Sequence, residues 1–119
     1  MRQPLRKSFY HAFMGIVATI KKERNIKIHL GFMMAVILCG FYFQLTKIEW
    51  LICMILFGLV ISLELVNTAI EAVVDLASPD YHELAKLAKD AAAGAVLVSA
   101  IASAIIGLSI FIPHLFSRL

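Results

Sequence analysis

Long apolar runs separated by short polar turns dominate the chain. Runs at residues 29–45, 48–76 and 79–113 are candidates, as α-helices, for crossing a hydrocarbon core of about 30 Å. The first run, with 17 residues, is near the lower limit for crossing. The second would form a helix roughly 40 Å long, so its C-terminal end passes the membrane boundary. The pattern predicts an all-α integral membrane protein with three transmembrane helices.

Residues 5–20, before the first run, have the periodicity of an amphipathic helix. Their apolar side chains recur on one helical face, while Arg6, Lys7 and His11 lie towards the other. The apolar members are Leu5, Phe9, Phe13, Ile16 and Ile20. This pattern predicts a surface helix that lies in the membrane interface. Packing of the same face on the protein itself is the alternative, and the two are compatible.

Two short breaks divide the apolar runs. The turn at residues 46–49 is followed by Trp50, a residue type that favours membrane interfaces. At the second break, serine is a favoured N-cap and proline suits the first helical position, so Ser78 and Pro79 predict that a third helix starts there. This helix becomes apolar from Ala91, where a group of small residues allows another helix to approach closely.

Composition supports a membrane protein and excludes an ordinary soluble domain. The chain has 119 residues, 61% of them hydrophobic, and a mean hydropathy of +0.89, which leaves too few polar residues for a water-facing shell. We therefore expect one small membrane domain over residues 1–119. Cys39 and Cys53 fall inside apolar runs without metal-ligand spacing, so we expect both to be free thiols.

The net charge of +3 comes largely from the first quarter of the chain. The basic residues there are Arg2, Arg6, Lys7, Lys21, Lys22, Arg24 and Lys27. Next to apolar spans, such a cluster favours anionic lipid headgroups on the cytoplasmic side over nucleic acid. The same rule places the 78–89 loop inside, and the Lys47 turn and the C-terminus outside. Charge balance within this cluster is one interpretation of Glu23, the only acid among the first 48 residues.

An acidic stripe closes the second run. Glu64, Asn67, Glu71 and Asp75 recur at helical spacing and share one face of the predicted helix within roughly 80°. Ionisable residues in membrane-like sequence are costly, so they need buried partners, a metal ion or a function. Acids near the membrane boundary suit Mg²⁺ with substrate phosphates, and a nearby lysine could balance phosphate charge. A deeper carboxylate could take the proton of a lipid hydroxyl.

Together these features favour phosphoryl transfer from a water-soluble donor to a lipid alcohol. A polar lock between helices that only holds an oligomer together is the alternative. The chain has no GxxxxGK[ST] or GxGxxG loop, so a nucleotide site must be built from helix side chains. His82, taken alone, is typical of an interfacial histidine.

Three segments form distinctive motifs. They are Glu64-Leu-Val-Asn-Thr-Ala-Ile-Glu-Ala-Val-Val-Asp75, Tyr81-His-Glu-Leu84 and Ala88-Lys-Asp-Ala-Ala-Ala-Gly-Ala-Val-Leu97. These motifs resemble the bacterial diacylglycerol kinase and undecaprenol kinase family, and the likeness covers nearly the whole chain. The resemblance implies a homotrimer of three-helix protomers with an added amphipathic surface helix. It also implies ATP- and Mg²⁺-dependent active sites formed between neighbouring protomers.

The resemblance implies roles for individual residues as well. Glu64 would be the general base acting on the lipid hydroxyl, while Glu23 and Glu71 would hold Mg²⁺ with the ATP phosphates. Asn67 and Asp75 would support the same polar cluster. The implied nucleotide-site residues are His11, Glu23, Glu71, Asp80, Tyr81, His82, Lys89 and Asp90.

The chain departs from the family pattern near its N-terminus. His11 stands where several relatives have tyrosine near the nucleotide. Pro4 stands where an arginine is usual, a place that Arg2 or Arg6 could fill.

Four segments resemble the Gram-positive branch of the family, in which undecaprenol is generally the preferred acceptor. They are Glu23-Arg-Asn-x-x-x-His29, Ile48-Glu-Trp50, Lys89-Asp-Ala-Ala-Ala-Gly-Ala95 and Gly107-Leu-x-Ile-Phe-Ile-Pro113. The resemblance therefore implies an undecaprenol kinase of the bacterial cell membrane with its active site on the cytoplasmic side. A diacylglycerol kinase that makes phosphatidic acid is the alternative with the same chemistry. A non-enzymatic oligomeric membrane protein or small transporter is more distant, because a transport path would distribute polar groups across the bilayer depth.

Overall fold

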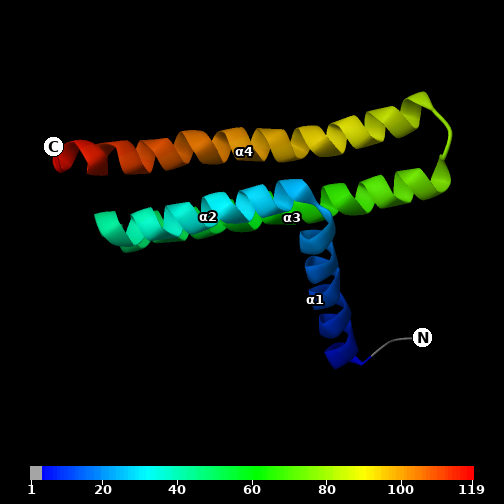
Figure 1. Cartoon of the computed structure of the whole chain (residues 1–119), viewed down its shortest axis with the longest axis horizontal. Helices are drawn as coiled ribbons and strands as arrows, with labels where there is room; N and C mark the ends of the chain where they lie inside the picture. Colours follow the sequence, from blue (N-terminus) through cyan, green and yellow to red (C-terminus); the bar gives the residue numbers. More distant parts are fainter. Residues whose placement is uncertain (1–3) are drawn as a thin grey trace.

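A computed structural model describes residues 4–119 as four α-helices and their connections (Figure 1). The helices are α1 (Leu5–Lys22), α2 (Arg24–Phe43), α3 (Lys47–Ala77) and α4 (Glu83–Ser117). By length and apolar composition, α2, α3 and α4 can each cross a membrane. The predicted all-α class with three transmembrane helices is therefore confirmed. Arg2, a candidate for the N-terminal arginine position, lies outside the described residues.

Helices α2, α3 and α4 lie side by side, and α1 leaves them at a steep angle (Figure 1). The 20 residues of α2 span about 30 Å, which matches the hydrocarbon core. The 31 residues of α3 and the 35 of α4 span about 46 and 52 Å, and their connected ends extend past the start of α2. We call these extended ends, residues 68–90, the projecting hairpin. It lies at the end of the bundle where α1 branches off.

Helix α1 buries none of its residues against the rest of the chain. Leu5, Phe9 and Phe13, which carry its apolar face, are between 62% and 73% exposed. Because α1 runs across the axes of the other helices, a bundle that crosses a membrane lays α1 along the membrane surface (Figure 1). Of the two predicted arrangements, the single chain favours the interfacial one.

A tight joint fixes α2 against α3. Thr46 and Glu49 form a capping box at the start of α3, in which each side chain accepts a hydrogen bond from the other residue's N–H, at 3.2 and 2.9 Å. Trp50 packs against Gly40, where an added Cβ atom would lie only 2.5 Å from the indole ring. Its ring also lies 5.1 Å from that of Phe41, measured between centroids. Trp50 therefore packs within the chain, in addition to its predicted place at an interface.

The start of α4 differs from the sequence-based prediction. The cap chemistry of Ser78 predicts a helix from Pro79, but α4 begins at Glu83 with His82 as its N-cap. The Nδ1 atom of His82 accepts a hydrogen bond from a main-chain N–H at 3.0 Å. Ser78 instead ends α3, and its hydroxyl donates to the carbonyl oxygen of Asp80. The prediction was wrong because the residues after Ser78 are needed to reverse the chain direction.

Two other helix ends extend beyond the predicted limits. Helix α2 begins at Arg24 rather than residue 29, and Ile26 in its first turn is fully buried. Helix α4 continues through Pro113 to Ser117 instead of ending near the proline. A proline in a helix removes its own N–H from the ladder. Contacts of the last turns with the α2–α3 joint hold this end in place.

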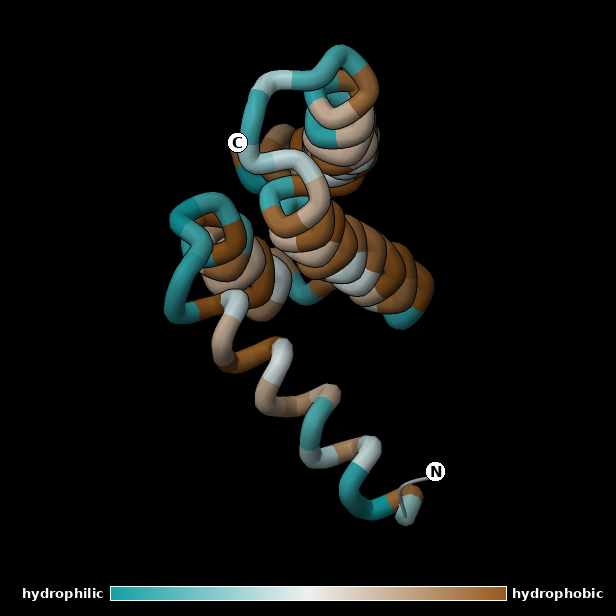
Figure 2. The backbone as a smooth tube through the Cα atoms, turned by 90° about the vertical axis from the view of Figure 1, so that its right-hand side faces the viewer, coloured by the Kyte–Doolittle hydropathy of each residue, from teal (hydrophilic) through white to brown (hydrophobic). Residues whose placement is uncertain are grey.

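The hydrophobic core of a single chain is small. Its buried apolar side chains are Ile26, Leu45, Cys53, Val60, Ala92 and Val96. Many other large apolar side chains of the bundle face outward, and apolar residues predominate along its helices (Figure 2). Contact of such a surface with water is unfavourable, whereas lipid chains or neighbouring protomers can cover it. Cys53 is buried and Cys39 exposed, and both are free thiols as predicted.

Candidate functional site

The acidic stripe runs along α3 from the interior of the bundle into the projecting hairpin. Glu64 and Asn67 are buried, with 2% and 8% of their surface exposed. Glu71 is half-buried, and Asp75 is exposed. The four residues share one face of a continuous helix, and their burial falls along its axis because α3 extends past the start of α2. The stripe therefore connects an apolar environment at Glu64 with water at Asp75.

Glu64 contacts a histidine that the sequence analysis did not identify as a site residue. The Nε2 atom of His29, on α2, lies 3.1 Å from Oε1 of Glu64, and the side chains are 23% and 3% exposed. This is an ion-pair distance, but the ring is not aligned for a hydrogen bond, and Oε1 has no hydrogen-bond partner within residues 4–119. The sequence does hold a signal for the pair. His29 lies 15 residues before Gln44 and Glu64 lies 18 after Thr46, so a short turn places them at similar depth.

Asn67 links the buried and half-buried parts of the stripe. Its side-chain amide donates to Oε1 of Glu71 over 3.3 Å. In the part of the chain that the structure describes, the amide oxygen of Asn67 is buried without a hydrogen-bond partner, as is the hydroxyl of Thr68. Unpaired buried oxygens cost free energy, so this position suits an additional donor or a cation.

Ion pairs join the charged residues of the projecting hairpin. The Nζ atom of Lys89 on α4 lies 2.5 Å from Oδ1 of Asp75 on α3, while Lys86 contacts Asp90 at 2.6 Å along α4. All four side chains are at least 42% exposed. Exposed pairs contribute only about 0–1 kcal/mol to stability. Lys89 and Asp90 can therefore exchange these partners for other charged groups at little cost in free energy.

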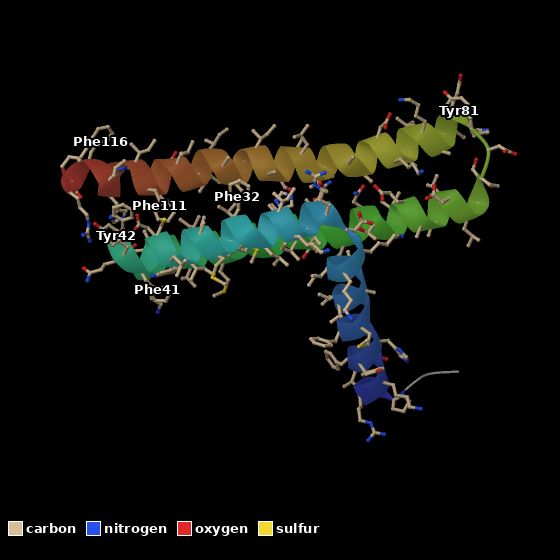
Figure 3. The ribbon with its side chains drawn as sticks, viewed as in Figure 1. Phe32, Phe41, Tyr42, Tyr81, Phe111 and Phe116 are labelled. Atoms are coloured by element: carbon tan, nitrogen blue, oxygen red, sulfur yellow. The ribbon has the colours of Figure 1, made fainter. Side chains whose placement is uncertain are left out.

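The remaining nucleotide-site residues implied by the resemblance lie apart from the stripe. His11 is exposed on α1, and its ring contacts that of Tyr10. Asp80, Tyr81 and His82 form the tip of the projecting hairpin, where Tyr81 is 78% exposed (Figure 3). No hydrogen bond or ion pair among residues 4–119 joins these side chains to the stripe. A single chain therefore does not assemble the whole predicted set.

Two carboxylates are candidates for holding Mg²⁺. Glu23 lies half-buried at the joint between α1 and α2, and its side chain does not cap α2. Glu71 is half-buried beside the unpaired amide oxygen of Asn67. Within residues 4–119, no three His, Cys, Asp or Glu side chains lie close enough to hold a metal ion by themselves. The donors still fit Mg²⁺, which is typically bound by one or two carboxylates with water and substrate phosphates.

An apolar cavity of about 450 Å³ lies between α2, α3 and α4. Its wall is apolar apart from the His29 ring, the Ser103 hydroxyl and the Cys53 thiol. His29 is the lining residue of α2 nearest to the start of that helix, and Phe111 is the last on α4. Phe32 and Phe111 lie on the facing sides of α2 and α4 (Figure 3). The cavity therefore extends from the level of His29 towards the opposite end of the bundle.

A second polar cluster, absent from the sequence-based prediction, lies at that opposite end. The Nε2 atom of His114 lies 3.0 and 3.1 Å from the two carboxylate oxygens of Glu49. Arg118 donates a hydrogen bond to the main-chain oxygen of Tyr42 at 2.9 Å. Its guanidinium carbon also lies 4.7 Å from the centroid of the Tyr42 ring. These contacts tie the end of α4 to the α2–α3 joint.

The chain is similar in sequence to known proteins. Residues 10–111 match the family model described as prokaryotic diacylglycerol kinase. The chain is 55% identical over 109 residues to an undecaprenol kinase of Bacillus subtilis (strain 168), with 92% of this chain and 89% of the relative covered. It is 41% identical over 128 aligned positions to a diacylglycerol kinase of Synechocystis sp., with 98% and 73% covered. A diacylglycerol kinase of Haemophilus influenzae is 32% identical over 90 residues, or 75% of each chain. The chain therefore belongs to the prokaryotic diacylglycerol kinase family.

Proposed function

We propose that the protein is an integral-membrane undecaprenol kinase, which transfers the γ-phosphate of ATP to undecaprenol and gives undecaprenyl phosphate. The lipid-kinase chemistry is supported chiefly by one observation: a buried carboxylate, Glu64, begins an acidic stripe that ends in water. The choice of acceptor is supported by the 55% identity to the Bacillus subtilis undecaprenol kinase. Family membership makes a lipid alcohol and ATP the expected substrates.

The reacting end of the stripe is Glu64. In this proposal its carboxylate accepts the proton of the lipid hydroxyl while the hydroxyl oxygen bonds to the γ-phosphorus of ATP, and ADP leaves. The burial of Glu64 favours this role, because the hydroxyl of a lipid alcohol lies near the apolar boundary. Asn67 orients Glu71 through its amide, and Asp75 pairs with Lys89 until the phosphates take its place.

The nucleotide would lie against the more exposed half of the stripe. Glu23 and Glu71 would hold Mg²⁺, which neutralises phosphate charge when bound. Lys89 would contact the phosphates in place of Asp75, since exposed ion pairs exchange readily. The further residues proposed to line the ATP site are His11, Asp80, Tyr81, His82 and Asp90.

We also propose a homotrimer whose active sites are shared between protomers. Support comes from the separation of α1 and the hairpin tip from the stripe in a single chain, and from the outward apolar surface of the bundle. A neighbouring protomer could supply the missing side chains and cover that surface. The basic residues around the α1–α2 joint lie at the same end as the projecting hairpin, which supports a cytoplasmic site.

A diacylglycerol kinase is the second candidate function. The relatives from Synechocystis sp. and Haemophilus influenzae carry that name, at 41% and 32% identity. The same base, metal ligands and nucleotide site would serve either acceptor, so the alternatives differ only in the lipid.

Phosphoryl transfer to the two lipids tests the proposal. Purified protein in mixed micelles with Mg²⁺ and γ-labelled ATP is offered undecaprenol and diacylglycerol, separately and in competition. We expect preferential labelling of undecaprenol and a rate lowered about 10²–10⁴-fold in Glu64→Gln. Glu49→Gln, on the same helix at the opposite end, is the matched control and should retain the wild-type rate. Preferential labelling of diacylglycerol would support the second candidate, and labelling of neither lipid would refute both.

A further inference from the structure

The contact between Glu64 and His29 is not explained by the stripe alone. Glu64 is one of the two largest fully buried side chains, and a carboxylate in such surroundings needs a compensating partner. Asn67 directs its amide to Glu71 and not to Glu64. Within residues 4–119, His29 is the one basic side chain that lies within 4.0 Å of the Glu64 carboxylate. The orientation of this carboxylate therefore depends on a residue of α2.

His29 also belongs to the wall of the apolar cavity, whereas Glu64 does not. The remainder of that wall offers only the hydroxyl of Ser103 and the thiol of Cys53 as polar groups. The imidazole of His29 thus contacts the buried carboxylate and the cavity at once. A lipid hydroxyl that reached Glu64 from the cavity would pass beside this ring.

We propose that His29 is a positioning residue for phosphoryl transfer, whose Nε2–H holds one carboxylate oxygen of Glu64 so that the other oxygen faces a lipid hydroxyl at the end of the cavity. The proposal rests on the lipid-kinase function proposed above. It adds a residue from α2 to a proposed site whose other side chains lie on α1, α3 and α4 and in the α1–α2 and α3–α4 connections.

A neutral imidazole that donates through Nε2 suits this role. Its N–H orients the carboxylate without removing the negative charge that a general base needs. The hydroxyl proton moves to the free oxygen of Glu64, the lipid oxygen bonds to the γ-phosphorus, and the bond from that phosphorus to ADP breaks. His29 itself neither gains nor loses a proton. Its ring must rotate to align the N–H, since catalytic hydrogen bonds are often poorly aligned before substrate binds.

Two replacements of His29 separate hydrogen bonding from packing. His29→Gln keeps an N–H donor at a similar reach, while His29→Leu removes the donor and keeps an apolar side chain. The matched controls are His114→Gln and His114→Leu, because His114 meets Glu49 of the same helix at 3.0 Å, but at the opposite end of the bundle. All four variants are measured for kcat with undecaprenol, KM for ATP, and binding of a non-hydrolysable ATP analogue with Mg²⁺.

We expect His29→Leu to lower kcat by about 10²-fold, the loss that a misplacement of roughly 1 Å produces. KM for ATP and affinity for the analogue should change by less than about twofold, since the nucleotide lies further along the stripe, and His29→Gln should recover most of kcat. Both His114 variants should retain kcat.

The inference is overturned if His29→Leu retains kcat, or if His29→Gln is as slow as His29→Leu. It is also overturned if analogue affinity falls in parallel with kcat, because that result indicates a general structural defect. An inactive wild-type protein would instead refute the proposed function, so the two failures are distinguishable.

Discussion

Replacement of Gly40 by alanine tests the joint that sets α2 against α3. A Cβ atom at Gly40 would lie 2.5 Å from Cη2 and 2.8 Å from Cζ2 of Trp50, and 3.1 Å from Cδ1 of Leu45. The indole is a rigid group that also packs against Phe41, so it cannot simply move its far end aside. Either α2 must shift away from α3 or the ring must leave its place. We therefore expect Gly40→Ala to destabilise the joint.

Two opposing effects set the expected change in the free energy of unfolding of Gly40→Ala. Alanine is favoured over glycine within a helix by about 0.8–1 kcal/mol, while overpacking of a close contact costs about 1–3 kcal/mol. Gly31, on the same helix, has open space around its Cβ position, so Gly31→Ala reports the first effect alone. The free energy of unfolding of Gly40→Ala should therefore be about 1–3 kcal/mol lower than that of Gly31→Ala.

The chain provides its own reporter for this comparison, because Trp50 is its single tryptophan. Both variants are unfolded by titration with SDS in mixed micelles and followed by far-UV circular dichroism and by tryptophan emission. Gly40→Ala should change the emission of the folded protein, and Gly31→Ala should not. Equal stability of the two variants, together with unchanged emission, would show that α2 and α3 do not meet closely at this position.

Three further predictions concern the charged groups. Lys89→Met should raise KM for ATP by about tenfold or more, as expected for loss of a charged hydrogen bond, whereas Lys86→Met on the same helix should not; equal effects would contradict the assignment. His114→Leu should lower the free energy of unfolding by about 1–2 kcal/mol in the SDS titration, because Glu49 loses its partner, and an unchanged midpoint would show that this contact is not formed. Removal of Mg²⁺ with EDTA should abolish phosphoryl transfer without reducing helix content, since no cluster in residues 4–119 can hold a metal ion by itself. A loss of circular dichroism signal on addition of EDTA would refute this expectation.

The types of element were predictable because they depend on local properties of the chain. Length and apolar composition identify the three spans, and a 3.6-residue period identifies α1. Boundaries were less predictable where tertiary contacts decide them. Ser78 has the chemistry of an N-cap, but the turn uses its hydroxyl, and Pro113 does not end α4 because the following turns contact the joint.

In the candidate site, too, the features set by local sequence were predictable and those set by tertiary contacts were not. The spacing of Glu64, Asn67 and Glu71 on one helix predicts a shared face, and the structure places all three there with burial that falls along the axis. The partners of Glu64 and Glu49 are histidines on other helices, and the second pair is separated by 65 residues in sequence. Such pairs depend on the register between helices, which the periodicity of a single helix does not contain. The roles of individual residues in binding ATP and Mg²⁺ stay predictions.

The unequal lengths of the helices suit the proposed chemistry, which joins two phases. A lipid alcohol stays in the apolar layer, whereas ATP with Mg²⁺ stays in water, so one site must reach both. Helix α2 has 20 residues, about the length that crosses the hydrocarbon core, but α3 has 31 and carries its stripe past the start of α2. At 1.5 Å per residue, Glu71 lies about 10 Å and Asp75 about 16 Å along the axis from Glu64. The helix itself thus fixes the distance between the proposed base and the charges proposed to receive the nucleotide. Moving the acid of Glu64 by one turn would keep the composition of the stripe. A shift away from Asp75 would separate the proposed base from ATP, and a shift towards Asp75 would separate it from the lipid alcohol.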